Sequence, residues 1–180
     1  MLKKIFLVTF IFLSLLAGCG YTGKSILPPT IKKVAIPTFA NKTLKYGIET
    51  RLTQSAIREF LIDGRLEIVS PEKADAIIEG TIRKYFLEPL LYDANNVVIQ
   101  YRLKMVVDIL FKDVKSNKII WEQSEIGGIP GGSTTFYVSS SGVNGVNRVK
   151  IDTEQEALER VYEKIARDIV NRVIYGWENP

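Results

Sequence analysis

The sequence predicts an α+β fold, a two-layer α/β sandwich in which two helices pack on one face of a mixed three- to four-stranded sheet. Residues 97–111 carry apolar side chains at every second position, a spacing that only a strand places on one side. One stretch near each end of the chain repeats apolar side chains at helical spacing. Because strands lie between these two helices, we expect both helices to cover one face of the sheet.

A short strand and a helix come first. Residues 34–39 form an apolar run that contains Pro37, whose missing N–H favours a sheet edge or a bulge. From residue 44 to residue 62 apolar side chains recur every four positions, and Gly64 follows, which predicts an amphipathic helix. The recurring side chains are Leu44, Ile48, Leu52, Ala56 and Phe60. A brief strand over residues 66–69 and an alternating strand over residues 75–86 come next.

The clearest strand covers residues 97–111. Its apolar side chains are Val97, Ile99, Tyr101, Leu103, Met105, Val107, Ile109 and Phe111. Residues 115–118 read as a turn that leads back into a strand over residues 119–125. The Gly- and Ser-containing stretch from residue 127 to residue 147 is expected to be a loop that is mobile until a partner orders it.

The last element is a capped helix. Thr153 and Glu156 have the spacing of a capping box, in which each side chain satisfies a backbone N–H of the first turn. A stripe of apolar side chains follows and ends near Gly176, as expected for a core-facing helix. The stripe consists of Leu158, Val161, Ile165, Ile169 and Val173.

The N-terminus has the layout of an export signal. Lys3 and Lys4 precede an apolar run that stops after about a dozen residues, which is too short to span a bilayer. Residues 16–19, Leu-Ala-Gly-Cys, are similar to the bacterial lipobox, and Cys19 is the one cysteine in the chain. We therefore expect a signal peptide over residues 1–18, a tether over residues 19–30 with its lipid on Cys19, and a single α/β domain over residues 31–180.

Composition excludes several function classes. The net charge is +4, and removal of Lys3 and Lys4 with the signal peptide would lower it to about +2, so a nucleic-acid binder is not expected. The sequence has no histidine, which removes the commonest general base and the Ser-His-Asp arrangement. We predict no enzyme activity, no cofactor and no metal. An envelope hydrolase built on Asp75 or Glu79 remains the less favoured alternative.

The polar face of the predicted sheet is the candidate binding surface. It carries Thr81, Arg83, Tyr85, Gln100, Arg102 and Lys104. This basic and partly aromatic set suits a partner that is both anionic and apolar. The alternative is a solvated sheet face with ordinary cross-strand pairs.

Several stretches, in order, resemble the LptE family of lipopolysaccharide-assembly lipoproteins. They are residues 19–21, 34–43, 48–53, 74–80 and 101–103, followed by the closing helix. The resemblance covers essentially the whole chain after the lipobox. It implies a two-layer domain that plugs and helps to assemble an outer-membrane β-barrel, the LptD subunit, and that contacts lipopolysaccharide on its way to the cell surface.

The resemblance also implies where contacts lie. In the family, basic residues near the hairpin tip of the sheet and just before the last helix contact lipopolysaccharide. Lys150 matches the second position, whereas the hairpin tip here has Tyr92 and Asp93. Gly20 after the lipidated cysteine is similar to the sorting signal for the outer membrane. An accessory lipoprotein of another envelope-assembly or secretion complex would share the anchor and the core, and it is the main alternative.

Overall fold

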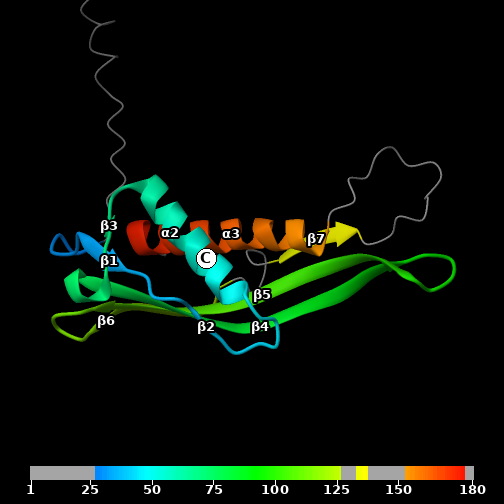
Figure 1. Cartoon of the computed structure of the whole chain (residues 1–180), viewed down its shortest axis with the longest axis horizontal. Coiled ribbons are helices and arrows are strands. Elements are labelled where there is room, and N and C mark those ends of the chain that lie inside the picture. Colours follow the sequence, from blue (N-terminus) through cyan, green and yellow to red (C-terminus); the bar gives the residue numbers. More distant parts are fainter. Residues whose placement is uncertain (1–26, 127–132, 138–152, 177–180) are drawn as a thin grey trace, which may run out of the picture.

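The computed structural model describes residues 27–126, 133–137 and 153–176, and it confirms the predicted fold class: two helices pack on one face of a mixed, open sheet (Figure 1). Over these described residues the sheet has seven strands instead of the three to four predicted. The strands are β1 (Lys33–Ala35), β2 (Ala40–Asn41), β3 (Glu67–Ile68), β4 (Ala76–Tyr92), β5 (Val98–Asp113), β6 (Ile119–Ile126) and β7 (Ser133–Tyr137). The helices are α2 (Ile48–Asp63), α3 (Glu154–Tyr175) and the short 3-10 turn η1 (Pro71–Lys73).

Strands β4 and β5 form the centre of the sheet. The order of the main path is β3-β1-β4-β5-β6, while β2 pairs with β4 and β7 pairs with β5. The pairs among β1, β2, β3 and β4 are parallel, and β4, β6 and β7 pair with β5 in the antiparallel direction. Strands β4 and β5 are 17 and 16 residues long, and their shared hairpin continues beyond the helices (Figure 1).

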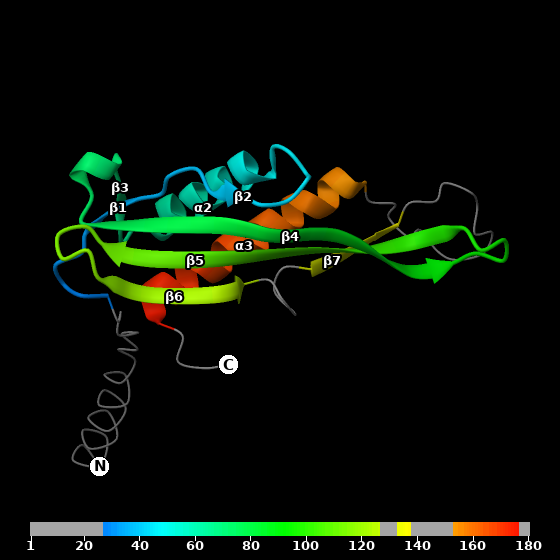
Figure 2. The same cartoon turned by 90° about the horizontal axis from the view of Figure 1, so that it is seen from below.

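The core lies between the sheet and the helices, as the alternation of β5 predicts. Leu103, Met105 and Val107 are fully buried, and Ile109 and Phe111 are 1% exposed. All five predicted apolar positions of α3 are also buried, and the capping box at Thr153 and Glu156 is present. Both helices lie on the same side of the sheet when it is seen from below (Figure 2). Within the described ranges, neither helix combines the length and apolarity needed to cross a membrane.

The start of the first helix differs from the prediction. Helix α2 begins at Ile48, and Leu44, which fits the four-residue spacing, lies before it and is 92% exposed. Gly47 has a φ of 83°, a left-handed conformation that only glycine adopts readily, so the helix does not extend back across it. The other four predicted positions of this helix are buried.

Part of the predicted loop is a strand. Residues 133–137, inside the stretch expected to be a structureless loop, form β7 and pair with residues 100–104 of β5. The prediction failed here because a short strand is stabilised by the edge it joins, which a local sequence pattern does not contain. The remaining residues of that stretch lie outside the described ranges, as do the expected signal peptide and most of the tether.

Phe39 packs directly on the backbone of β4. The side chain of Phe39 is 3% exposed, and its backbone N–H donates to Thr53 Oγ1 of α2 at 3.0 Å. A Cβ placed on Gly80 would lie 2.5 Å from this ring. Glycine at position 80 therefore allows the ring to approach the strand closely.

Candidate partner-binding surface

The predicted surface is the face of the sheet opposite the helices, which we call the outer face. On β5 the buried side chains are at odd positions, with Val106 as the exception, so Arg102, Lys104 and Asp108 point to the outer face. Both Arg102 and Lys104 are partly exposed, as the alternation predicts. They are not covered by α2 or α3, which lie on the other side (Figure 2).

Glu88 of β4 joins the two basic side chains. Glu88 is the register partner of Arg102, and its carboxylate lies 2.8 Å from Lys104 Nζ and 3.6 Å from Arg102 Nη1. The hydrogen bond from Lys104 lowers the pKa of Glu88, and the charges of Lys104 and Arg102 act in the same direction. The ammonium group of Lys104 also lies 5.5 Å from the centre of the Phe86 ring, within the range of a cation–π contact.

Arg83 has an acidic partner as well. Its Nε lies 3.2 Å from Asp108 Oδ2, and the other oxygen of Asp108 accepts a hydrogen bond from the Glu125 N–H at 3.0 Å. All three basic residues predicted as contacts on the sheet are therefore in ion pairs. Lys84 forms no ion pair with another described residue. Over the part of the chain that the structure describes, the outer face is thus a ladder of paired charges beside Lys84, rather than a uniformly basic patch.

Tyr85 lies on the opposite face from the one predicted. The register shifts between Ile82 and Lys84, so Arg83 is an extra residue and the alternation reverses after it. Tyr85 consequently pairs with the buried Met105, and its hydroxyl donates to Glu154 at the start of α3. Burial, followed by the hydrogen bond to Glu154, raises the pKa of Tyr85.

Glu154 links three elements near this bulge. Its carboxylate accepts the Tyr85 hydroxyl and lies 2.8 Å from Lys45 Nζ, in the segment between β2 and α2. The hydrogen bonds from Lys45 and Tyr85 lower the pKa of Glu154. The sequence reasoning missed this contact, because residues 45, 85 and 154 are far apart in the chain and no local pattern connects them.

A groove of about 310 Å³ lies beside the bulge. Its lining residues come from two segments, residues 43–45 and residues 83–86. Leu44 on one wall is 92% exposed and Phe86 on the other is 41% exposed. Apolar side chains in open positions flanked by Arg83 and Lys84 make this the part of the surface suited to a partner with apolar and acidic groups.

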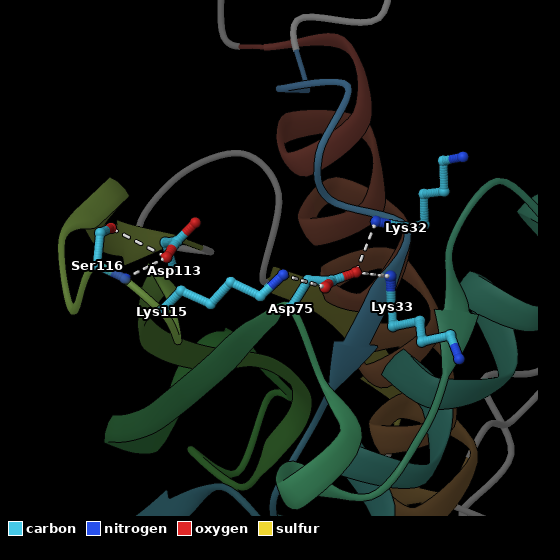
Figure 3. A network of polar contacts seen from close by, with 6 residues as sticks. All are labelled: Lys32, Lys33, Asp75, Asp113, Lys115 and Ser116. Atoms are coloured by element: carbon cyan, nitrogen blue, oxygen red, sulfur yellow. Dashed lines mark hydrogen bonds and ion pairs between the residues drawn. The ribbon is translucent and has the colours of Figure 1, made fainter.

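Asp75 has a structural role. One of its carboxylate oxygens accepts the backbone N–H groups of Lys32 and Lys33 at 3.1 and 3.0 Å, and the other lies 3.6 Å from Lys115 Nζ (Figure 3). The two backbone hydrogen bonds lower the pKa of Asp75, so the group is held ionised. Asp75 therefore ties the segment before β1 to the start of β4 and to the turn after β5.

The neighbouring carboxylates are also engaged. Asp113 accepts the N–H and the hydroxyl of Ser116 at 2.7 and 2.9 Å in the same turn (Figure 3). Glu79 lies 3.9 Å from Lys112 Nζ. Among the described residues, no cluster of three or more His, Cys, Asp or Glu side chains is placed to hold a metal ion. The carboxylates considered for a hydrolase thus serve as backbone acceptors and ion-pair partners.

Two predicted site residues lie outside the described ranges: Cys19 and Lys150. The hairpin tip is described, and Asp93 forms it by accepting the N–H groups of Asn95 and Val97 at 2.8 Å each. Tyr92 beside it is 53% exposed. The tip therefore has the exposed ring of Tyr92 in place of a basic side chain, and the Asp93 carboxylate is occupied by hydrogen bonds within the turn.

Comparison with known proteins gives one family and a group of similar folds. The family model of lipopolysaccharide-assembly, LptE, matches residues 31–173. No curated protein sequence matches the chain. Among solved structures, the PelC dodecamer from Paraburkholderia phytofirmans is 14% identical, covers 83% of this chain and 96% of its own, and has a TM-score of 0.50.

Two further solved structures are similar to the chain at lower scores. A hypothetical protein from Chlamydia trachomatis is 14% identical over 79% of this chain and 95% of its own, with a TM-score of 0.49. A minor lipoprotein from Acinetobacter baumannii is 16% identical over 81% of this chain and 92% of its own, with a TM-score of 0.42. At these identities the likeness to PelC concerns the fold alone.

Proposed function

The chain belongs to the LptE lipopolysaccharide-assembly family, and from that premise we propose that it plugs and helps to assemble an LptD β-barrel in the outer membrane. The family consists of non-enzymatic lipoproteins of the bacterial envelope, and its members act in lipopolysaccharide assembly together with LptD. The finer parts of the proposal are the outer-membrane location, the position within the barrel lumen, the lipid anchor on Cys19 and the residues that make contact.

The family match over residues 31–173 carries this proposal. The described domain adds a surface suited to it, because charged side chains stand on a sheet face that the helices leave uncovered. Paired charges of this kind remain hydrated, as suits a domain surrounded by the polar interior of a large barrel. The domain over residues 31–180 would then be the part inside the barrel, with residues 19–30 leading back to the membrane.

Lipopolysaccharide contact is assigned to Arg83, Arg102, Lys104 and Lys150. Arginine and lysine bind phosphate groups by charge-assisted hydrogen bonds, and lipid A carries such phosphates. Arg102 and Lys104 share one carboxylate, Glu88, so this trio has one positive charge in excess. Glu88 would therefore compete with an anionic headgroup for these two cations.

Affinity capture of the full lipidated chain from membranes tests the assignment. We expect an LptD-type barrel to co-purify with the tagged protein. The matched control replaces residues 1–19 with an export signal that is cleaved without lipidation, which should leave the protein in the soluble periplasmic fraction. Capture of a different envelope complex, or of no barrel under conditions that preserve the membrane anchor, would reject the proposal.

A further inference from the structure

One edge of β4 is paired along half of its length. Strand β1 pairs with Ala76 and Ile77, and β2 pairs with Thr81 and Ile82. From residue 83 to residue 92, β4 pairs with β5, and no other described strand joins it. An uncovered edge of this length is uncommon, because its backbone groups can pair with another chain.

A polar turn directs β2 away from this edge. The Lys42 N–H donates to the Ile82 carbonyl at 2.9 Å, which is the last backbone contact between the two segments. Asn41 Oδ1 then accepts the N–H and the hydroxyl of Thr43, and Asn41 Nδ2 donates to the Lys45 carbonyl at 2.8 Å. The chain therefore leaves the sheet at residue 42 and enters α2.

The register gives the direction of the free backbone groups. The Ile82 carbonyl points away from β5, since it accepts from Lys42. With the extra residue at Arg83, Lys84 faces Val106 and the pattern alternates from there. Tyr85 and Leu87 therefore direct both N–H and C=O toward the open edge. Pro89 is the next such residue, and since it has no N–H it limits the segment that a new strand can pair with.

Side chains beside this edge fit a particular kind of strand. The groove lined by residues 43–45 and residues 83–86 includes Tyr85, whose backbone groups pair with no other described strand. Leu44 and Phe86 offer apolar contact on either side. Lys84 has a charge without an acidic partner among the described residues. An extended segment with an apolar side chain next to an acidic one could form hydrogen bonds with the edge of β4, place its apolar side chain in the groove and pair its carboxylate with Lys84.

We propose that residues 84–88 of β4 form a strand-addition site for an extended, apolar and acidic segment of the LptD barrel partner. The incoming strand takes the place that β2 vacates, inserts its apolar side chain between Leu44 and Phe86, and pairs its carboxylate with Lys84. Backbone hydrogen bonds supply affinity in such additions and side-chain pockets supply specificity. This inference rests on the proposed function, since it names the surface by which the barrel is held.

Leu44→Glu and Tyr46→Glu form a matched pair of variants. Leu44 and Tyr46 are 92% and 89% exposed, so neither change should affect the melting temperature. Leu44 lines the groove and Tyr46 does not. A carboxylate at position 44 would meet an acidic, apolar segment, so Leu44→Glu should lower barrel recovery in the capture experiment by about fivefold or more, equivalent to about 1 kcal/mol. Tyr46→Glu should leave recovery unchanged.

Photo-cross-linking in cells identifies the occupant. A benzophenone amino acid at Phe86 of the full lipidated chain, which keeps an aromatic side chain in the groove and leaves Lys84 in place, should give an adduct with the barrel that maps to one extended segment. The same probe at Glu122 of β6 should give little. Equal yields at both positions, an adduct at position 86 with lipopolysaccharide instead of protein, or equal effects of the two glutamate variants would overturn the inference. If the unmodified chain captures the barrel while these tests fail, the strand-addition site is wrong but the proposed function stands. If the unmodified chain captures no barrel, the proposed function itself fails.

Discussion

Gly80→Ala should destabilise the domain through a steric conflict with Phe39. The added methyl would lie 2.5 Å from the ring, and real Cβ atoms do not approach ring carbons so closely. Phe39 is 3% exposed and its backbone is held by Thr53, so the ring has little room to withdraw. Overpacking of this kind costs about 1–3 kcal/mol. For a chain of this size we expect the melting temperature to fall by roughly 2–12 °C.

Thermal and urea unfolding of the full chain, followed by circular dichroism, measures this loss. Phe39→Leu shortens the side chain and should itself cost about 1 kcal/mol through a small cavity. In the double variant the methyl at position 80 should fit beside the smaller leucine. The combined loss should therefore be smaller than the sum of the two single losses by about 1 kcal/mol. Strict additivity, or an unchanged midpoint for Gly80→Ala, would refute the reasoning.

Three further changes test other parts of the structure. Thr153→Ala removes the side-chain acceptor at the start of α3 and should lower the free energy of unfolding by about 1 kcal/mol in urea titration; an unchanged midpoint would contradict the capping role. Burial raises the pKa of Asp168, so the ionised carboxylate destabilises the folded domain at a pH above the pKa. Asp168→Asn should therefore raise the melting temperature at pH 7. This gain should vanish as the pH falls and Asp168 of the unmodified chain becomes protonated. Glu88→Gln should strengthen lipopolysaccharide binding by the full chain, and the double variant Arg102→Gln, Lys104→Gln should weaken it, each by about two- to fivefold in affinity measured by titration. If both variants changed the affinity in the same direction, these three residues would not belong to the binding site.

The sequence predicted the elements with long, regular periods. Strand β5 buries the selected side chains from Leu103 to Phe111, and helix α3 buries all five of its selected side chains, because each spacing matches one secondary structure over many residues. The prediction was wrong at the start of the strand, where Val97 lies before β5 and is 57% exposed. The capping box at Thr153 was also visible, since its two partners are three residues apart. The fold class follows from these elements and from their order.

Tyr85 shows what local patterns leave out. The alternation over residues 75–86 placed it with Thr81 and Arg83, but the bulge at Arg83 turns it toward α3. A bulge depends on how two strands align, so the segment around Arg83 carries no signal of its own. The acidic partners of Arg83, Arg102 and Lys104 were missed for the same reason, because they depend on the register between β4 and β5.

The prediction for Leu44 was wrong for a different reason, because the sequence itself contains the residue that ends the helix before Leu44. The four-residue spacing included it, yet Gly47 stands between it and the rest of the helix. Glycine costs about 1 kcal/mol within a helix, and here it adopts a left-handed conformation that ends the helical run. Gly47 therefore marks the start of the helix in the sequence, and Leu44 belongs to the preceding segment, where it lines the groove.

The helices cover the hairpin of β4 and β5 along part of its length (Figure 1). At about 3.3 Å per residue its strands are roughly 50 Å long, and the helices cover the part nearer β1 and β3 (Figure 1). Where two layers share a core, any bending would disturb that packing, while the far part can curve and twist at small energetic cost. Hydrogen exchange should accordingly be fast in the far part and slow under the helices. A domain built in this way can follow the curvature of an enclosing wall at one end without deforming its hydrophobic core at the other.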